Sequence, residues 1–352
     1  MIQYITSNMG TLTDVPSAMG NPREDQFQGT WAERLIEIAG RVCYDSFGKG
    51  RSSTDFQQHL VDVGHTSVHQ HVAFTAPPAD LAVEANLPGV TICMGRVTAN
   101  LRLAIEIERH TMDTEVQAKY RLIRQHLMPT VYGVASQPSP IIKPVYPEEK
   151  YVSLLMVGSR GFSHEQVRHH RQCAVSQRST RYCDESTTPW IYHPLMSKIS
   201  DHLGAKIEAH ESAAKRLYTE IVKELQTSGV SRKQARGAAR SVLGTALETR
   251  LVFTASMAQW KRMICQRMTH AADAEIRMIY NDVVTCLIEQ GWIRPLAMEP
   301  AEDGAGYALA ELHAYTVCTR KGNIMVLAAD TDRAMSVAGV KPCDVISVEE
   351  RV

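Results

Sequence analysis

The spacing of apolar residues in the first half of the chain predicts helices alternating with short strands. A period of three to four residues predicts a helix over Trp31–Gly40 and a second helix that begins at Ser53 or Thr54. Residues 98–128 also have a helical pattern, whereas residues 128–149 are rich in proline and are expected to form a linker. Short apolar runs predict strands at residues 71–76, 89–95 and 151–158.

The second half of the chain has longer helical periods. Ser163 and Gln166 match a capping box, so a helix is expected to begin at Ser163. A long amphipathic helix is expected over Asp201–Ser228, and Ser231 and Gln234 match a second capping box that begins the next helix. Two further helices are expected at residues 256–268 and 270–291.

The composition changes after Pro295, where the pattern becomes strand, turn, strand, helix, strand. This segment is expected to form a small appended unit. Together the patterns predict an α+β protein with more helix than strand. A length of 352 residues is typical of one large domain or two of ordinary size.

Charge and cysteine content narrow the class of protein. Lysine plus arginine and aspartate plus glutamate each number 38, so the net charge is zero, which argues against a nucleic-acid platform but permits a local pocket for a small anion. The eight cysteines include no C-x-x-C pair, and a reducing cytoplasm is the default expectation. The chain shows no secretory signal and no apolar run of about 18 residues, so no membrane association is expected.

One segment, RHHRQCAVSQRSTRYCDES at residues 168–186, has an unusual composition. It contains four arginines, two adjacent histidines and several hydroxyl side chains, and its second half leaves the helical period and is expected to be a loop. Guanidinium groups bind phosphate oxygens in a bidentate manner, and hydroxyl groups can complete such a shell. The segment therefore predicts either a phosphate or nucleotide pocket or an exposed basic turn held by salt bridges.

Two further arginine clusters leave similar alternatives open. Arg236 and Arg240 are four residues apart on a predicted helix, so they repel each other unless an anion or a carboxylate such as Glu248 lies near them. In the helix at 256–268, Met263, Ile264 and Met268 would face the core and leave Arg262, Gln266 and Arg267 on another surface. That helix is equally well explained as a purely structural amphipathic one.

Three histidines, His65, His69 and His71, are close together in the sequence GHTSVHQH. If a strand begins near His69, then His69 and His71 share one face of it. A metal site needs three or four ligands with a supporting shell, and no cysteine or carboxylate is nearby. A hydrogen-bonding turn is therefore favoured over a metal centre, and no metal is expected.

Taken together, these segments resemble the flavin-dependent thymidylate synthases. The family's central R-H-R, spacer, S-x-R-Y signature is similar to HHRQCAVSQRSTRY, which follows an SHEQ segment. GRVCYDS is similar to the family's early A-R-V-S-F segment, and HLVDVGHTSVHQHVAFT is similar to its G-H-x-T/S-x-x-E-H stretch. ARSVLGTALETR and RMTHAADAEIR are similar to its two C-terminal motifs. The matches extend over about residues 40–290 in the family's order.

The chain departs from the family pattern at several positions. His169 stands where the family has arginine, Ala174 replaces a spacer serine, and the asparagines expected near Ser256 and Arg262 are absent. The resemblance implies an α+β fold with helices around a mixed sheet. It also implies a catalytic domain over residues 1–295 with an insertion at about 76–150, followed by the appended unit at 296–352.

The resemblance further implies the reaction and the partners. FAD would be reduced by NAD(P)H, methylenetetrahydrofolate would supply one carbon, and C5 of a uridylate, dUMP or UMP, would be methylated without a cysteine nucleophile. A branch of the family methylates UMP in nucleoside-antibiotic (polyoxin) biosynthesis, and this divergent chain is a candidate for that branch. Active sites formed between the subunits of a homotetramer are implied as well.

The family's residues can be carried over by position. Arg267 would activate the pyrimidine, because a guanidinium beside its N3/O2 edge favours the ionised base. The nucleotide would be bound by Gln166, Arg168, His169, Gln177, Arg178, Ser179, Thr180, Arg181 and Arg240. The flavin would be bound by His65, Ser67, His169, His170, Arg171, Gln177, Ser256 and Arg262.

Two rival hypotheses come from other classes of protein. A non-catalytic nucleotide- or RNA-binding protein on a decayed scaffold of the same family would keep the arginines, bind oligonucleotides in a salt-sensitive manner and lack flavin. A metalloenzyme built on the histidines would contain a metal detectable by elemental analysis. The zero net charge and the presence of Arg267 favour the flavoenzyme over the first rival.

Overall fold

The computed structural model describes residues 2–7, 27–81, 90–170, 172–310, 313–319, 322–328 and 345–351. The chain divides into two compact units, Met1–Met263 and Ile264–Val352. Helices and open sheets occur in both, which confirms the expected α+β class. No helix within the described ranges is long and apolar enough to cross a membrane.

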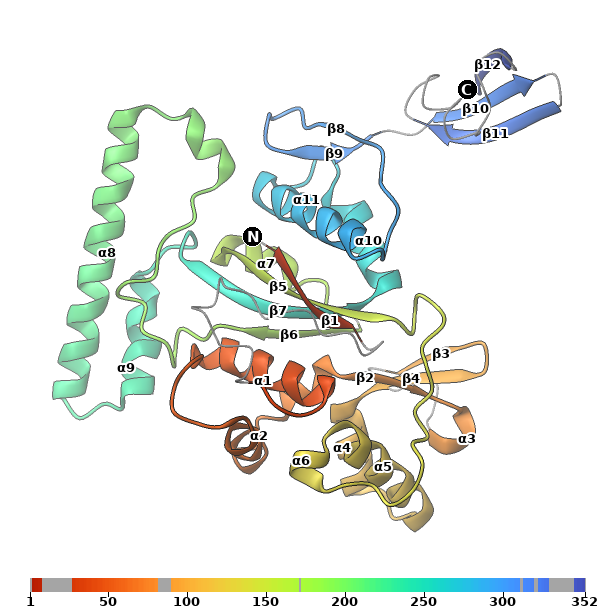
Figure 1. Cartoon of the computed structure of the whole chain (residues 1–352). Helices are drawn as coiled ribbons and strands as arrows, with labels where there is room; N and C mark the ends of the chain where they lie inside the picture. Colours follow the sequence, from red (N-terminus) through yellow and green to blue (C-terminus); the bar gives the residue numbers. More distant parts are fainter. Residues whose placement is uncertain are drawn as a thin grey trace. The chain divides into compact units, whose positions relative to one another are not determined.

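A four-stranded sheet forms the centre of the first unit (Figure 1). Its order is β1 (Ile2–Ser7), β5 (Tyr151–Ser159), β7 (Glu248–Ser256) and β6 (Cys173–Gln177). β5 and β7 pair along their whole lengths, with Tyr151 opposite Ser256 and Ser159 opposite Glu248. All strand pairs among the described residues are antiparallel, so the prediction of a mixed sheet is wrong.

Helix α1 (Trp31–Tyr44) packs against β6 and β7 with its apolar face (Figure 1). Thr30 and Glu33 form a capping box at its start, and Leu35, Ile36 and Ile38 are fully buried. The helix is one turn longer than predicted. The next helix, α2 (Ser53–Asp62), is capped by Ser52 rather than by Ser53 or Thr54, because the Ser52 hydroxyl accepts from the Asp55 amide.

Residues 73–132 contain a small sheet and several helices. The sheet has the order β2 (Ala73–Ala76), β4 (Arg96–Asn100), β3 (Thr91–Cys93), and the helices are α3 (Pro78–Leu81), α4 (Leu101–His110), α5 (Thr114–Leu127) and α6 (Pro129–Tyr132). The helical pattern of residues 98–128 is confirmed by α4 and α5, although residues 98–100 belong to β4 and residues 111–113 separate the two helices. Asn100 caps α4 and Asp113 caps α5, so two capping side chains divide the segment.

The segment around the central motif also differs from the prediction. Helix α7 (Arg160–Gln166) begins directly at the end of β5, capped by Ser159, whose hydroxyl accepts from the Phe162 amide at 3.0 Å. Ser163 lies inside the helix, so the predicted start there is wrong. Residues 173–177 form the edge strand β6 instead of a loop. Its buried positions are Ala174 and Ser176, which give no apolar alternation in the sequence.

After the short η4 (Pro194–Lys198), two helices form a hairpin beside the sheet (Figure 1). Helix α8 (Asp201–Thr227) has the predicted length, and Gly229 follows it with a φ of +85°. Helix α9 (Arg232–Ala239) is capped by Ser231, as predicted. Arg240 lies just beyond α9 in the 3-10 helix η5 (Arg240–Val242).

Helix α10 (Met257–Arg267) runs from the first unit into the second. The second unit contains α11 (Ala274–Glu289), the hairpin of β8 (Met298–Pro300) and β9 (Tyr307–Leu309), and a sheet of β11 (Gly322–Ala328), β10 (His313–Thr319) and β12 (Val345–Arg351). The three predicted C-terminal strands are confirmed. The helix expected between the last two lies outside the described residues.

Candidate functional site

A cavity of about 430 Å³ joins three segments that are distant in the sequence. They are the end of α1, the loop after α2, and the end of β6 with the turn that follows it. The cavity is lined by Cys43, Tyr44, Val63, Gly64, His65, Gln177, Ser179 and Tyr182. The fold thus brings together His65, Gln177 and Ser179, which were predicted as site residues from two separate motifs.

Tyr44 and His65 form one wall of this cavity. α1 ends at Asp45 in the left-handed region, with a φ of +48°. The Tyr44 hydroxyl lies 3.1 Å from Nδ1 of His65, and the Tyr44 ring makes edge contacts with His65 and Tyr182. Burial lowers the pKa of His65 and raises that of Tyr44. Both side chains are therefore neutral near pH 7, and the imidazole can exchange hydrogen bonds with a ligand.

The turn after β6 is held in place by backbone and side-chain hydrogen bonds. The Ser179 amide donates to the Cys43 carbonyl at 3.0 Å, which ties the turn to the end of α1. The Gln177 amide group donates to the hydroxyls of Ser163 and Thr249, at 2.9 and 3.1 Å. A ligand in the cavity would therefore meet a preorganised surface rather than a free loop.

The Arg178 side chain points into the protein and contacts acidic groups there, whereas the sequence predicted that it binds the nucleotide. Its guanidinium is 2.5 Å from the buried Glu185 carboxylate and 3.4 Å from that of Asp45, and it also donates to the Asp184 carbonyl at 3.2 Å. All three of its nitrogens thus have partners within the protein. In this structure Arg178 supports the turn, as in the salt-bridge alternative for this segment.

Arg181 and Arg240 each connect the turn after β6 with the segment formed by α9 and η5. Arg240 Nη1 donates to the Thr180 hydroxyl at 3.2 Å, across 60 positions of sequence. The Arg181 side chain lies over Gly237 of α9, where an added Cβ would be 3.7 Å from Arg181 Cγ. Both arginines are exposed and have no carboxylate partner among the described residues. Their guanidinium groups are available to bind an anion.

The other arginines of the second cluster have carboxylate partners. Arg236 forms an ion pair with Asp184 at 2.9 Å and donates to the Tyr182 carbonyl. Arg250 pairs with Glu248 at 3.2 Å, so the carboxylate beside Arg236 is Asp184 and not Glu248. Arg236 and Arg250 are therefore paired with carboxylates. Arg240 is exposed, has no such partner in the described part of the chain, and contacts the turn after β6.

Arg160, at the start of α7, is a residue that sequence reasoning missed. Its guanidinium donates to the Arg178 carbonyl at 2.9 Å, and its Nε atom is buried without a hydrogen-bond partner in the described part of the chain. Burial lowers the pKa of Arg160, and the charges of Arg178 and Arg240 lower it further. A lone arginine after an apolar strand gives no signal in the sequence that it joins this positively charged cluster.

The remaining predicted residues of the central motif lie in varied environments. Gln166 is buried, with its amide 3.9 Å from the Met263 sulfur, and Arg168 is exposed and paired with Glu165. His169 is half-buried, and His170 is exposed with Nδ1 3.1 Å from the Arg168 carbonyl oxygen. Arg171 lies outside the described residues.

The more distant candidates are on three other elements. Ser67 is half-buried within η3 (Thr66–His71), and Ser256 is buried at the start of α10, where its hydroxyl accepts from the Gln259 amide. Arg262 is exposed on α10, and Arg267 is the half-buried last residue of that helix and belongs to the second unit. Met263 and Ile264 are buried, as predicted.

The three clustered histidines are directed to separate partners, because residues 66–71 form η3 rather than a strand. His69 Nδ1 is 3.2 Å from the Thr66 carbonyl oxygen. His71 lies between the hydroxyls of Thr254 at 2.7 Å and Ser176 at 2.9 Å, and burial lowers its pKa to about 3. Among the described residues, no group of three or more histidine, cysteine or acidic side chains could hold a metal ion.

Comparison with known proteins agrees with the motifs. Residues 148–290 match the family model described as thymidylate synthase complementing protein. Three mycobacterial proteins named flavin-dependent thymidylate synthase are similar over most of their length. They come from Mycobacterium sp. strain JLS (32% identity, 79% of this chain, 85% of the relative), Mycolicibacterium vanbaalenii (34%, 72% and 75%) and Mycobacterium sp. strain KMS (25%, 79% and 85%).

Proposed function

Because this chain belongs to the flavin-dependent thymidylate synthase family, we propose that it methylates C5 of a uridylate. The substrate is dUMP or UMP, methylenetetrahydrofolate is the carbon donor, and NAD(P)H is the reductant. The divergent residues of the motif make UMP methylation in nucleoside-antibiotic biosynthesis a specific version of this proposal. A flavin as the cofactor follows from the family itself.

The observation that carries the proposal is the contact of the turn after β6 with α9 and η5, where Arg240 donates to the Thr180 hydroxyl and the Arg181 side chain lies over Gly237. The guanidinium groups of Arg181 and Arg240 are both exposed. With the Thr180 hydroxyl they lie at this turn, next to Ser179 in the cavity wall. This combination suits a phosphate monoester, whose oxygens accept several charge-assisted hydrogen bonds at once. The phosphate would bind here, and Gln177 would contact the base or the flavin.

The composition of the cavity also fits a flavin ring. The rings of Tyr44, Tyr182 and the neutral His65, which meet edge to face, offer apolar aromatic surface with a few polar atoms. We assign the flavin to His65, Ser67, His169, His170, Arg171, Gln177, Ser256 and Arg262. Bound FAD would supply the redox chemistry, and the residues of the chain would orient the reactants and exclude water. A volume of about 430 Å³ suits a ring system rather than a whole dinucleotide.

We also propose a homotetramer, in which residues of neighbouring subunits complete each pocket. Arg267 is proposed to stabilise the pyrimidine in its ionised form, since a nearby positive charge lowers the pKa of the ring N3. Electrostatic stabilisation of this kind is usually a large part of catalysis. Gln166, Arg168 and His169 complete the proposed nucleotide shell.

The proposal is tested by purifying the full chain and measuring two properties. The first is visible absorption, which should show bound flavin. The second is release of tritium from C5 of labelled dUMP and, in parallel, UMP, in the presence of methylenetetrahydrofolate and NADPH. An Arg267→Gln variant should keep the flavin spectrum and lose tritium release by at least about a hundredfold, given the typical size of such electrostatic effects.

A colourless protein that binds no added FAD and releases no tritium would contradict the proposal. Salt-sensitive binding of an oligonucleotide by such a protein would instead support the non-catalytic alternative. The ratio of rates with dUMP and UMP decides between the two versions of the substrate. A site that hydrogen-bonds the 2′-hydroxyl can discriminate strongly, whereas an apolar pocket discriminates by only about a hundredfold.

A further inference from the structure

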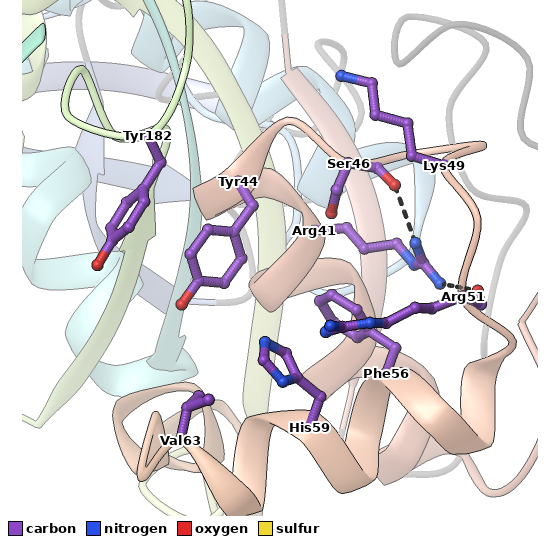
Figure 2. A pocket seen from close by; sticks show the side chains of 9 residues that line it. All are labelled: Arg41, Tyr44, Ser46, Lys49, Arg51, Phe56, His59, Val63 and Tyr182. Carbon is purple, nitrogen blue, oxygen red and sulfur yellow. Dashed lines mark hydrogen bonds between the residues drawn. The ribbon is translucent and has the colours of Figure 1, made fainter. Parts of the chain in front are cut away.

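A second cavity, of about 380 Å³, adjoins the first (Figure 2). The two share Tyr44, Val63 and Tyr182 in their walls. A third cavity, also about 380 Å³, shares Arg41, Lys49 and Arg51 with the second. Because neighbouring cavities share these lining residues, we treat the three together and call them the extended groove. It leads from Gln177 and Ser179, past the two tyrosines, to the loop between α1 and α2.

The far end of the extended groove is positively charged. Lys49, Arg51 and His59 line the second cavity, and no acidic side chain is among the described residues that line it or the third cavity. Two carboxylates of the neighbouring segments have other partners. That of Asp45 contacts Arg178, and that of Asp55 accepts from the Ser52 hydroxyl.

The cations at this end are not equivalent. Arg41 is buried and already neutralised, because it forms an ion pair with Glu37 at 2.7 Å and donates to the carbonyls of Ser46 and Arg51. Lys49 donates to the Asp45 carbonyl at 2.7 Å, and Figure 2 shows its amino group directed away from Arg51 and His59. The Arg51 guanidinium has no ion-pair partner in the described ranges. Figure 2 shows its side chain directed from the loop towards His59.

The groove thus has an aromatic end and a cationic end. We infer that Arg51, at the end of the groove whose wall also contains Lys49 and His59, binds the anionic tail, carboxylate or phosphate, of an elongated co-substrate whose planar ring lies near Tyr44 and Tyr182. A guanidinium without a carboxylate partner, set in a concave site, is suited to bind such oxygens. The identity of the co-substrate rests on the proposed function, whereas the anion preference rests on the groove alone.

Two co-substrates of the proposed reaction carry such a tail. A folate bears the carboxylates of its glutamyl chain, and NADPH bears phosphates, including one at the 2′ position that NADH lacks. The two sources are separated by comparing folates with one and with three glutamyl residues, and by comparing NADPH with NADH. Whichever pair shows an affinity difference that depends on Arg51 identifies the tail.

The experiment uses the full chain and two variants that each lose one positive charge. Arg51→Gln removes the proposed ligand, and Arg216→Gln removes an exposed arginine of α8 that lines none of the three cavities. Calorimetry would measure binding of the four ligands directly. We expect Arg51→Gln to weaken binding of the triglutamyl folate or of NADPH about five- to tenfold, as for loss of a partly exposed charged hydrogen bond. Arg216→Gln should leave both unchanged.

Salt dependence gives a second measurement. Raising the ionic strength from about 0.01 M to 0.15 M shortens the screening length from about 30 to about 8 Å, so it should weaken binding to the wild type more than to Arg51→Gln. Equal affinities of wild type and Arg51→Gln for all four ligands would overturn the inference. Because binding needs no turnover, an Arg51-dependent affinity in a protein without tritium release would refute the proposed function but not the anion site.

Discussion

The Tyr44 hydroxyl lies 3.1 Å from Nδ1 of His65, so the last residue of α1 orients an imidazole that reaches the cavity from the loop after α2. The contact connects α1, whose apolar face is buried in the core, with the loop after α2 in the cavity wall. Both groups are neutral near pH 7, because burial lowers the pKa of His65 and raises that of Tyr44. The hydrogen bond therefore fixes the orientation of the His65 ring and involves no charged side chain.

Replacing Tyr44 by phenylalanine should slow the reaction without unfolding the protein. The variant keeps the ring and loses one hydrogen bond, worth about 1 kcal/mol, so tritium release should fall about fivefold. Tyr192→Phe is the matched control, since it removes a hydroxyl that contacts Glu211 far along the chain from this wall. Equal losses in the two variants would show that Tyr44 has no special relation to the cavity.

The buried pair of Arg178 and Glu185 should be important for stability. Glu185 is fully buried and its carboxylate is 2.5 Å from the guanidinium, so Glu185→Gln leaves a buried positive charge with weakened compensation. We expect the free energy of unfolding in urea to fall by about 3–5 kcal/mol. Glu165→Gln, whose partner Arg168 is 69% exposed, should change it by less than about 1 kcal/mol. A similar small effect in both variants would contradict the supporting role of Arg178.

Loss of Arg240 should weaken binding of the nucleotide phosphate. Removing a charge-assisted hydrogen bond costs about 1.5–3 kcal/mol, so the dissociation constant of dUMP or UMP should rise about 10- to 150-fold in Arg240→Gln. Arg232→Gln, on the exposed first position of α9, is the matched control. Uridine, which lacks the phosphate, should bind equally to all three proteins. An Arg240→Gln effect of the same size on uridine would exclude a phosphate contact.

The protein should lose stability as the pH falls below about 6.5, in part because of His71. Burial lowers its pKa from the ordinary 6.5 to about 3, so the folded protein keeps it neutral while the unfolded chain protonates it. The unfolded state therefore binds more protons in this window, and stability falls by up to about 1.4 kcal/mol per pH unit. Above pH 6.5 the contribution is complete and constant.

His71→Gln tests this assignment through the slope of the free energy of unfolding against pH, rather than through the free energy at one pH. Between pH 6.5 and 5 most carboxylates stay ionised, so urea unfolding over this range reports chiefly on histidines. The variant should have a lower free energy of unfolding and a slope shallower than that of the wild type. His69, with a pKa lowered by burial to about 4, accounts for part of the remaining slope. Parallel slopes in the two proteins would contradict the neutral, buried state of His71.

Much of the helical framework could be predicted from the sequence, because long amphipathic periods such as those of α1, α8 and α11 dominate any local preference. β6 could not, since its buried positions are Ala174 and Ser176, and the Ser176 hydroxyl is satisfied by His71 from another segment. The helix caps at Ser52 and Ser159 were placed wrongly because several hydroxyl residues compete near each start.

The candidate site was predicted in part for a similar reason. His65, Gln177 and Ser179 line one cavity, because their types and spacing follow a motif. The inward orientation of Arg178 was not predictable, because only the fold buries the Glu185 carboxylate against it and brings Asp45 from 133 positions away. Arg160 was missed because its neighbours in the sequence are apolar or small, and only the fold brings it to Arg178.

The strand order of the central sheet has a consequence for folding during synthesis of the chain. β6, which positions the turn at 178–182, pairs only with β7 among the described strands, and β7 ends at Ser256. A chain emerging from the ribosome therefore holds the cavity residues long before β6 has a neighbour to pair with. Ligand recognition should appear late in synthesis, so binding of a ligand can report that β6 has paired with β7.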